Sequence, residues 1–316
     1  MYKEILSYER LTQTALLALP RQQAVVFWTV SPIEVHGPHL PLGTDVRLGE
    51  DVVRRTAKLW LAKYPERPAI MLPPLCLGAD VLPLPGSLPV SSSVIVDAVV
   101  QVGRALYDNG FRTLVFGSNH GGPRHLVALE QARRTLMEQS GMVVVNPFGA
   151  LINALTSRDP ALLTYAQMDP ATPLGGPDDV HAGTLETSLA LASFADDVDP
   201  AYKTLPKVVV PRNGRVAGVL RVAAEKLRGS RNEGRSARTA LGLDFAAGLL
   251  EWIAMKPTPG YVGEPASANA ELGERALAGM AKYTLDLLER SIAGTAPEDV
   301  SEPLIWDARM LTRLPL

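Results

Sequence analysis

The run of mostly apolar residues at positions 24–30 constrains the fold of this chain more than any other segment. Its length and apolar character predict a strand that is buried on both faces of a sheet. The strand would end at Ser31 and Pro32, where a polar loop from Glu34 to Asp45 begins. A sheet whose two faces are both buried needs other elements packed on each face, so this segment predicts a sheet lying between layers of helices.

Short apolar runs alternate with longer helix-patterned segments along the chain, which indicates an α/β fold with a largely parallel sheet. Thr44 is the predicted cap of the first long helix. Residues 73–89, rich in proline and glycine, predict a long loop that walls a pocket. Further strands are predicted at 70–72, 113–116 and 142–145, and helices at 45–62, from 91–93 to 109–110, at 184–195 and at 270–292.

Length and composition favour one large domain over residues 1–316. The chain of 316 residues is 47% hydrophobic and 20% charged, so it can bury a large core without being divided. The composition changes around residues 216–256, which we interpret as an insertion in the domain. Residues 294–316 carry little periodicity and predict an irregular C-terminal tail.

The charge balance and the cysteine content restrict the partners and the compartment. The formal net charge is −2, which gives no general attraction to nucleic acids or anionic membranes. A small-molecule partner is therefore expected. The single cysteine, Cys76, cannot form an internal disulfide, which suits a reducing compartment such as the cytoplasm. No run approaches the length of a membrane span, and the N-terminal segment does not read as a signal peptide.

Candidate chemistry collects where strands are predicted to end. Histidine is the commonest metal ligand and the usual proton carrier near neutral pH, and the chain has only five. Ligand sites of open α/β sheets lie beyond the carboxyl ends of the strands, so the strands 24–30 and 113–116 would deliver their following loops to one edge. The five histidines are His36, His39, His120, His125 and His181.

Carboxylates accompany these histidines. Glu34 and His36 are two residues apart, so in extended chain they point the same way, and Asp45 could bridge two cations. Such mixed nitrogen and oxygen ligands suit zinc, manganese or iron(II) rather than calcium. Simpler readings are a helix cap for Asp45 and surface positions for His36 and His39. We expect His125 to pack on a helix surface.

Several motifs together resemble the creatininase family in order and spacing. The first, at 33–45, combines three candidate ligands with glycine and proline turns. The others are Asn-His-Gly-Gly at 119–122, His-Ala-Gly-Thr-Leu-Glu-Thr-Ser at 181–188, Leu-Pro-Gly-Ser at 84–87 and Gly-Tyr-Val-Gly-Glu-Pro at 260–265. The resemblance covers about residues 20–290 and implies a three-layer α/β/α sandwich, a homo-oligomer and a two-metal amidohydrolase.

The resemblance also implies a role for each ligand. Glu34 and His120 would hold one divalent ion, His36 the other, and Asp45 would bridge both. Creatininase itself has a glutamate where this chain has Gly122, so Glu186 is inferred as the remaining carboxylate ligand. Zinc is the first choice of metal, with manganese or iron at one position, and no residues are assigned to an organic cofactor.

His181 and Glu186 form the predicted catalytic set. A metal-bridging hydroxide would attack a C–N amide-type bond in a cyclic amide, a formamide or a similar small substrate, and His181 would pass the proton to the leaving nitrogen. The simpler reading of His181 is a helix-entry histidine bonded to backbone. The chain has no tryptophan between residues 61 and 251, where creatininase closes its pocket with tryptophans, which argues against creatinine.

Two other functions fit the same residues. A lactonase or a peptidase would use the same hydroxide, because it attacks esters and peptides as well. A binding or assembly subunit would keep the fold and lose turnover, an alternative motivated by the altered pocket segments and by the insertion.

Overall fold

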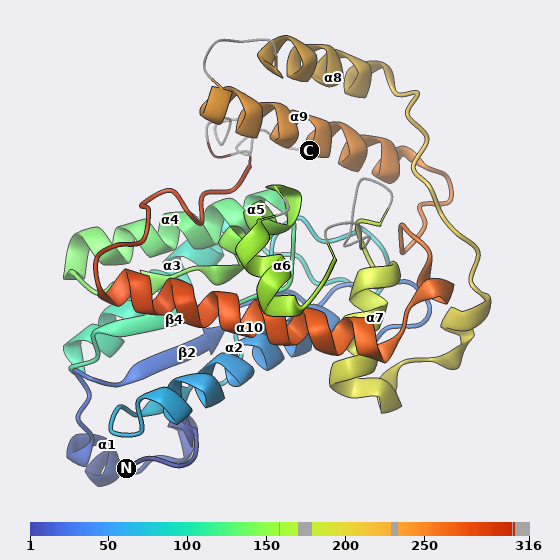
Figure 1. Cartoon of the computed structure of the whole chain (residues 1–316). Coiled ribbons are helices and arrows are strands. Elements are labelled where there is room, and N and C mark those ends of the chain that lie inside the picture. The colour runs from blue at the N-terminus through green and yellow to red at the C-terminus, as the bar shows by residue number, and fades with distance from the viewer. Residues whose placement is uncertain (158, 170–178, 229–232, 305, 307–316) are drawn as a thin grey trace.

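The computed structural model describes residues 1–157, 159–169, 179–228, 233–304 and 306. Its centre is a five-stranded sheet in the order β1-β3-β2-β4-β5, and every neighbouring pair is parallel (Figure 1). The predicted central strand is β2, which pairs with β3 on one side and β4 on the other. The strands are β1 (Leu6–Ser7), β2 (Val25–Thr29), β3 (Ala69–Met71), β4 (Thr113–Gly117) and β5 (Val143–Val145).

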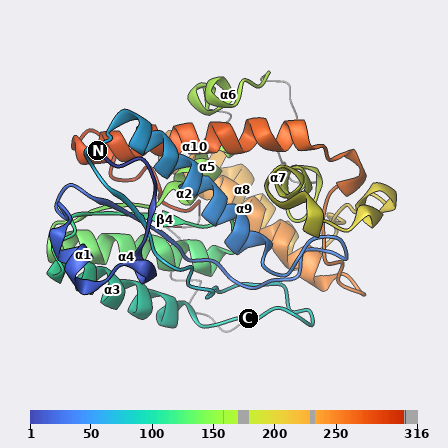
Figure 2. The ribbon, with the colours of Figure 1, turned by 90° about the horizontal axis from the view of Figure 1, so that it is seen from below.

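Helices cover both faces of this sheet, and the side chains of β2 show how. Successive residues of a strand point to opposite faces. Val26 and Trp28 enter the apolar core that the sheet shares with α3 and α4, whereas Val25 and Phe27 enter the core shared with α2 and α10. Viewed from below, α2 and α10 lie on one side of β4, and α3 and α4 on the other (Figure 2). The prediction of a three-layer α/β/α sandwich is confirmed.

The predicted helices and strands agree with the structure to within one or two residues at their ends. The predicted cap is wrong, because Thr44 is the first residue of α2 and its hydroxyl donates to Pro41 O at 2.6 Å. The helices are α1 (Gln13–Ala18), α2 (Thr44–Lys63), α3 (Ser92–Asp108), α4 (Pro123–Ser140), α5 (Pro147–Ser157), α6 (Pro160–Ala166), α7 (Thr184–Phe194), α8 (Arg215–Arg228), α9 (Glu233–Ala254) and α10 (Ala270–Ile292).

The segment that we interpreted as an insertion contains the helices α8 and α9. They pack against each other and lie beyond the end of α5, away from the layer of α2 and α10 (Figure 1). Arg221 and the buried Glu251 form an ion pair between them. Whether this hairpin is an insertion in an evolutionary sense stays a prediction.

The described part of the predicted tail is irregular yet fixed to the sandwich. Ser301 donates to the buried carboxylate of Glu130 at 3.1 Å, and Arg133 donates to Glu298 O at 2.9 Å. The remainder of the tail, residues 305 and 307–316, lies outside the described residues. Within the described part of the chain, no helix combines the length and the apolar character that a membrane crossing requires.

A glycine at the contact between α10 and α7 provides a test of this packing. A Cβ at Gly273 would overlap the backbone of Ser188 and Leu189 in α7. We expect Gly273→Ala to push the helices apart and to lower the free energy of unfolding by about 1–3 kcal/mol, as overpacking does. Urea denaturation followed by circular dichroism measures the change.

Gly218 provides the matched control, because it also is the fourth residue of its helix and a Cβ there would meet nothing within 4 Å. Gly218→Ala should be neutral or stabilising by up to about 1 kcal/mol, because alanine is the better helix former. Equal stability of the two variants would contradict the close contact between α7 and α10.

Candidate metal centre

The candidate site lies where the order of the strands reverses. From β2 the chain proceeds to β3 on one side and then returns to β4 on the other, so the loops after β2 and β4 leave in different directions. The two strands are in register to their ends, where Thr29 pairs with Gly117. The segments that follow them carry Glu34, His36 and His120, so this topology brings the predicted residues to one edge.

The first cluster of ligand atoms joins Glu34, Asp45 and His120. His120 Nδ1 lies 2.9 Å from Glu34 Oε2 and 3.3 Å from Asp45 Oδ2, and all three residues are buried. One ligand atom from each residue lies within 4.8 Å of the others, a spacing that can accommodate a metal ion.

The second cluster joins His36, Asp45 and Glu186. His36 Nε2 lies 3.2 Å from Asp45 Oδ1 and 3.9 Å from Glu186 Oε2. These atoms also meet the spacing of a metal site. Asp45 belongs to both clusters and directs one carboxylate oxygen toward each histidine. All five residues that the sequence predicted as ligands therefore converge.

Backbone carbonyls orient the two imidazoles. His36 Nδ1 lies 3.1 Å from Glu34 O, and His120 Nε2 lies 2.9 Å from Ala79 O. A carbonyl can only accept, so the ring nitrogen facing it carries a proton, and the opposite nitrogen is directed at the carboxylates, where its lone pair would be available to a cation once its own proton is lost. Metal-binding histidines commonly have this arrangement. Residue 79 lies in the predicted loop 73–89, which is confirmed as irregular and reaches the site.

Unpaired buried atoms indicate what these clusters require. Within the described residues, Glu34 Oε2, His36 Nε2 and Asp45 Oδ2 are buried without a hydrogen bond of suitable geometry. Such atoms are costly to bury unless something compensates for the lost water. Because all three face the shared clusters, divalent cations fit this donor set.

The electrostatics lead to the same conclusion. Burial disfavours the charged forms, but His36 and His120 outweigh this effect and hold the pKa of Asp45 well below its usual range. Likewise, burial opposes a charge on His36, yet the Asp45 carboxylate raises the pKa of His36 to about 10. The carboxylates are thus balanced by protons on imidazoles when no cation is present. A metal ion would replace those protons.

His181 and Glu186 lie beside the second cluster. The His181 ring stacks on His36 with 4.2 Å between centroids, and its Nε2 lies 2.8 Å from Val35 O. Its Nδ1 faces Glu186 Oε2 at 4.0 Å, and His181 also satisfies the spacing of a ligand group with Glu34 and His36. A proton carrier and a metal ligand are both consistent with this geometry.

The backbone and a neighbouring amide orient Glu186. Ala182 N–H donates to Glu186 Oε2 at 2.6 Å, and Asn119 Nδ2 donates to Glu186 Oε1 at 2.9 Å. Ala182 has φ of 48°, a left-handed conformation that a residue with a side chain rarely adopts. Strain of this kind is typical of functional sites. The role of Asn119 was not predicted, although it directly precedes His120 in the motif.

Two expectations about histidines are wrong. The simpler reading of His36 and His39 as surface residues fails, because both are buried and His39 Nε2 lies 2.9 Å from Thr187 Oγ1. His125, expected on a helix surface, is fully buried beside His120, and burial lowers the pKa of His125 to about 3. The polar loop folds inward and the first turn of α4 faces the sheet, which sequence composition does not reveal.

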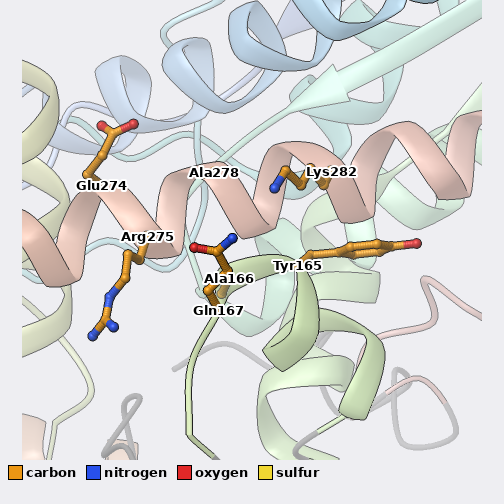
Figure 3. A pocket seen from close by; sticks show the side chains of 7 residues that line it. All are labelled: Tyr165, Ala166, Gln167, Glu274, Arg275, Ala278 and Lys282. Atoms are coloured by element: carbon orange, nitrogen blue, oxygen red, sulfur yellow. The ribbon is translucent and has the colours of Figure 1, made fainter.

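A hollow elsewhere on the molecule lacks this chemistry. It lies between α6 and α10, and Figure 3 shows that Glu274 and Arg275 leave α10 in different directions. Glu274 is bound by Arg55 at 2.6 Å, and the lining contains no histidine. This hollow therefore is not a second metal centre of the same kind.

The fold and the acid–histidine clusters define an α/β/α protein with a candidate metal centre, and comparison with known proteins gives its family. The chain belongs to the creatininase family, whose model, described as creatinine amidohydrolase, matches residues 9–288. It is 27% identical to the mycofactocin precursor peptide peptidase of Mycolicibacterium smegmatis, over 84% of this chain and 85% of that protein. It is 23% identical to the 3-dehydro-scyllo-inosose hydrolase of Thermotoga maritima, over 98% of this chain and 89% of that protein.

Solved structures confirm the fold. A putative creatinine amidohydrolase from Bacteroides fragilis superposes with a TM-score of 0.63 and 20% identity, covering 92% of this chain and 97% of that one. A structure described as creatininase Mn has a TM-score of 0.59 and 20% identity, covering 90% of this chain and 97% of that one.

Adjacent glycines allow a test of the His120 position. A Cβ at Gly122 would overlap His120 Nε2 and lie 2.7 Å from Ala79 O, so it would separate this histidine from its carbonyl. We expect Gly122→Ala to weaken metal affinity about 10–100-fold, as changes to outer contacts of metal ligands do. Competition with a chelating dye, in folded protein checked by circular dichroism, measures the affinity.

Gly121→Ala is the control, because a Cβ there would meet nothing within 4 Å. Its metal affinity should equal that of the unaltered chain. An unchanged affinity in Gly122→Ala would contradict the proposed role of His120.

Proposed function

We propose that this protein is a two-metal hydrolase that cleaves a C–N amide-type bond in a small substrate. The observation that carries the proposal is the position of Asp45, whose two carboxylate oxygens face separate acid–histidine clusters. Glu34, Asp45 and His120 would hold one ion, and His36, Asp45 and Glu186 the other. Zinc is the first candidate, and manganese or iron would suit the same donors.

The bound ions would supply an activated water and polarise the attacked carbonyl. The protein's own residues define where this chemistry takes place. Glu34 Oε1 accepts a hydrogen bond from Leu82 N and Glu186 Oε2 accepts one from Ala182 N, each at 2.6 Å, and these bonds fix how the two carboxylates lie at their clusters. Such prior orientation avoids reorganisation during the reaction.

His181 is the residue that we assign to proton transfer. With its Nε2 facing Val35 O at 2.8 Å, its Nδ1 is left to exchange a proton beside Glu186. Nδ1 lies at the edge of the second cluster, where a leaving nitrogen would need a proton. This backbone bond is also the simpler reading of His181, and the two roles are compatible because one ring nitrogen serves each.

The class of bond is supported by the family and by its members. Creatinine amidohydrolase and the peptide peptidase are named for reactions on C–N bonds, and the inosose hydrolase is named for a different substrate. A peptidase is therefore the second candidate for this centre, favoured by the relative that is 27% identical. A lactonase and a non-catalytic assembly subunit are further alternatives, and the metal analysis below addresses the assembly subunit.

The expected homo-oligomer and the expected cytoplasmic location stay predictions. The homo-oligomer derives from the family resemblance, and the location derives from the lone cysteine.

Removal of the metal should abolish activity. We expect the chelated protein to hydrolyse no member of a panel of cyclic amides, formamides, ureas and short peptides, and zinc or manganese to restore turnover. Metal analysis should give two equivalents per chain, because two clusters share Asp45. Turnover that survives exhaustive chelation would refute the metal mechanism, and substoichiometric metal without turnover would favour the assembly subunit.

His36 and His181 should differ in what they control. His36→Ala should reduce metal content and turnover together, because His36 belongs to the second cluster. His181→Ala should retain both metal ions and lower kcat by about 10²–10⁴, the usual contribution of acid–base catalysis. Metal content and kcat are measured on the same preparations, and loss of metal from His181→Ala would identify His181 as a ligand instead.

A further inference from the structure

The catalytic histidine proposed above contacts a residue from the α8–α9 hairpin. The rings of His181 and Trp252 lie 5.2 Å apart between centroids, with 49° between their planes. Trp252 lies near the C-terminal end of α9, far from the metal ligands in the sequence. It is only 6% exposed, so its ring is enclosed by protein. A side chain buried in this way acts on the reaction through its neighbours.

Trp252 is itself held in place by the segment that pairs with His181. Its Nε1–H donates to Pro259 O at 2.9 Å. Three residues later, Val262 N–H donates to His181 O at 2.8 Å. The side chains of Trp252 and Val262 share one apolar cluster, whose other buried members are Leu82 and Val210.

This apolar cluster also extends to the first cluster of ligand atoms, which contains Glu34. Leu82 packs in it, and the backbone N–H of Leu82 donates to Glu34 Oε1 at 2.6 Å. The end of α9 is thus connected by packing to a candidate metal ligand and by ring contact to His181. Each of the two contacts fixes a group whose orientation matters for the chemistry.

The His181 ring needs this support. Among the residues that the structure describes, its ring has one hydrogen bond, from Nε2 to Val35 O, which leaves the ring free to tilt about the bonded nitrogen. Contact with the His36 ring at 4.2 Å limits that tilt, and contact with Trp252 limits it further. Without the indole, His181 could turn its Nδ1 away from Glu186, and a displacement of about 1 Å in a reacting group can cost about 10²-fold in rate.

We propose that Trp252 is a positioning residue, which holds the His181 ring in the orientation required for proton transfer and so makes the α8–α9 hairpin part of the active site. This inference rests on the proposed function, because it takes His181 as the proton carrier. Trp252 does not contact the ions, so its removal should leave the metal centre loaded.

Two substitutions of Trp252 distinguish the effect of losing the aromatic ring from the effect of changing the side-chain volume. Trp252→Leu keeps an apolar side chain and removes the aromatic contact, whereas Trp252→Phe keeps a ring. In the zinc-loaded protein we expect Trp252→Leu to lower kcat about 10–100-fold, with little change in KM, and Trp252→Phe to stay within about threefold of the unaltered chain. Both variants should bind as much zinc as the unaltered chain.

The control is Leu249→Ala, one turn earlier on α9 and packed against the same apolar cluster. It removes packing from the cluster without removing the ring beside His181. It should leave kcat near that of the unaltered chain. An equal fall in kcat for Leu249→Ala and Trp252→Leu would show a general structural effect and overturn the inference.

A second readout does not depend on activity. The chain has five histidines, so selective ¹³C labelling of the imidazoles gives five resonances, and His181→Gln identifies the one from His181. An indole ring shifts the resonances of nuclei beside it, so the His181 signal should move in zinc-loaded Trp252→Leu and stay in place in Leu249→Ala. A His181 signal that does not move in Trp252→Leu overturns the inference.

The two proposals can fail separately. If the unaltered chain hydrolyses no member of the substrate panel, the proposed function is contradicted together with the role of Trp252 in proton transfer, and the His181 resonance then decides only whether Trp252 contacts that ring. If the chain is active and the resonance moves while kcat stays constant in Trp252→Leu, the contact exists without a role in proton transfer, and the inference is overturned.

Discussion

The shared carboxylate of Asp45 is the interaction on which the arrangement of the site depends. Its two oxygens lie 3.2 Å from His36 and 3.3 Å from His120, so histidines from separate loops must meet around one buried acid. Asp45 lies in the first turn of α2, where the helix dipole favours a negative charge. Gly49, one turn later, lacks a side chain where the backbone of Ser118 approaches, since a Cβ there would lie 2.9 Å from Ser118 N. This close approach brings α2 beside the exit of β4.

A buried acid of this kind is tolerated only if its charge is compensated. The adjacent imidazoles perform this function in the absence of a cation, and they hold the pKa of Asp45 low despite burial. The carbonyls of Glu34 and Ala79 fix which imidazole nitrogen faces the acid. The groups that orient the two imidazoles are thus backbone carbonyls, and a side-chain substitution elsewhere in the pocket would leave them in place. The candidate metal centre can then stay constant while its surroundings change.

The surroundings are where related proteins are expected to differ. The two relatives are named for a peptide and for a 3-dehydro-scyllo-inosose, so membership of the family does not by itself select a substrate. In this chain the α8–α9 hairpin supplies Trp252 next to His181, from a segment whose composition differs from that of the sandwich. The hairpin is therefore the first region to examine for what distinguishes this protein.

The sequence alone indicated the strands β2, β3, β4 and β5, the helices α2, α3, α7 and α10, and the candidate ligands. The run 24–30 could only be a strand buried on both faces, and the motifs 33–45 and 119–122 placed glycines, histidines and acids in a recognisable order. Only the tertiary structure decided that His39 and His125 are buried, that Asn119 and Ala182 orient Glu186, and that Trp252 contacts His181. The physical reason is range: strand and helix patterns arise from neighbouring residues, whereas these contacts join distant segments whose meeting depends on how the packed layers direct the loops.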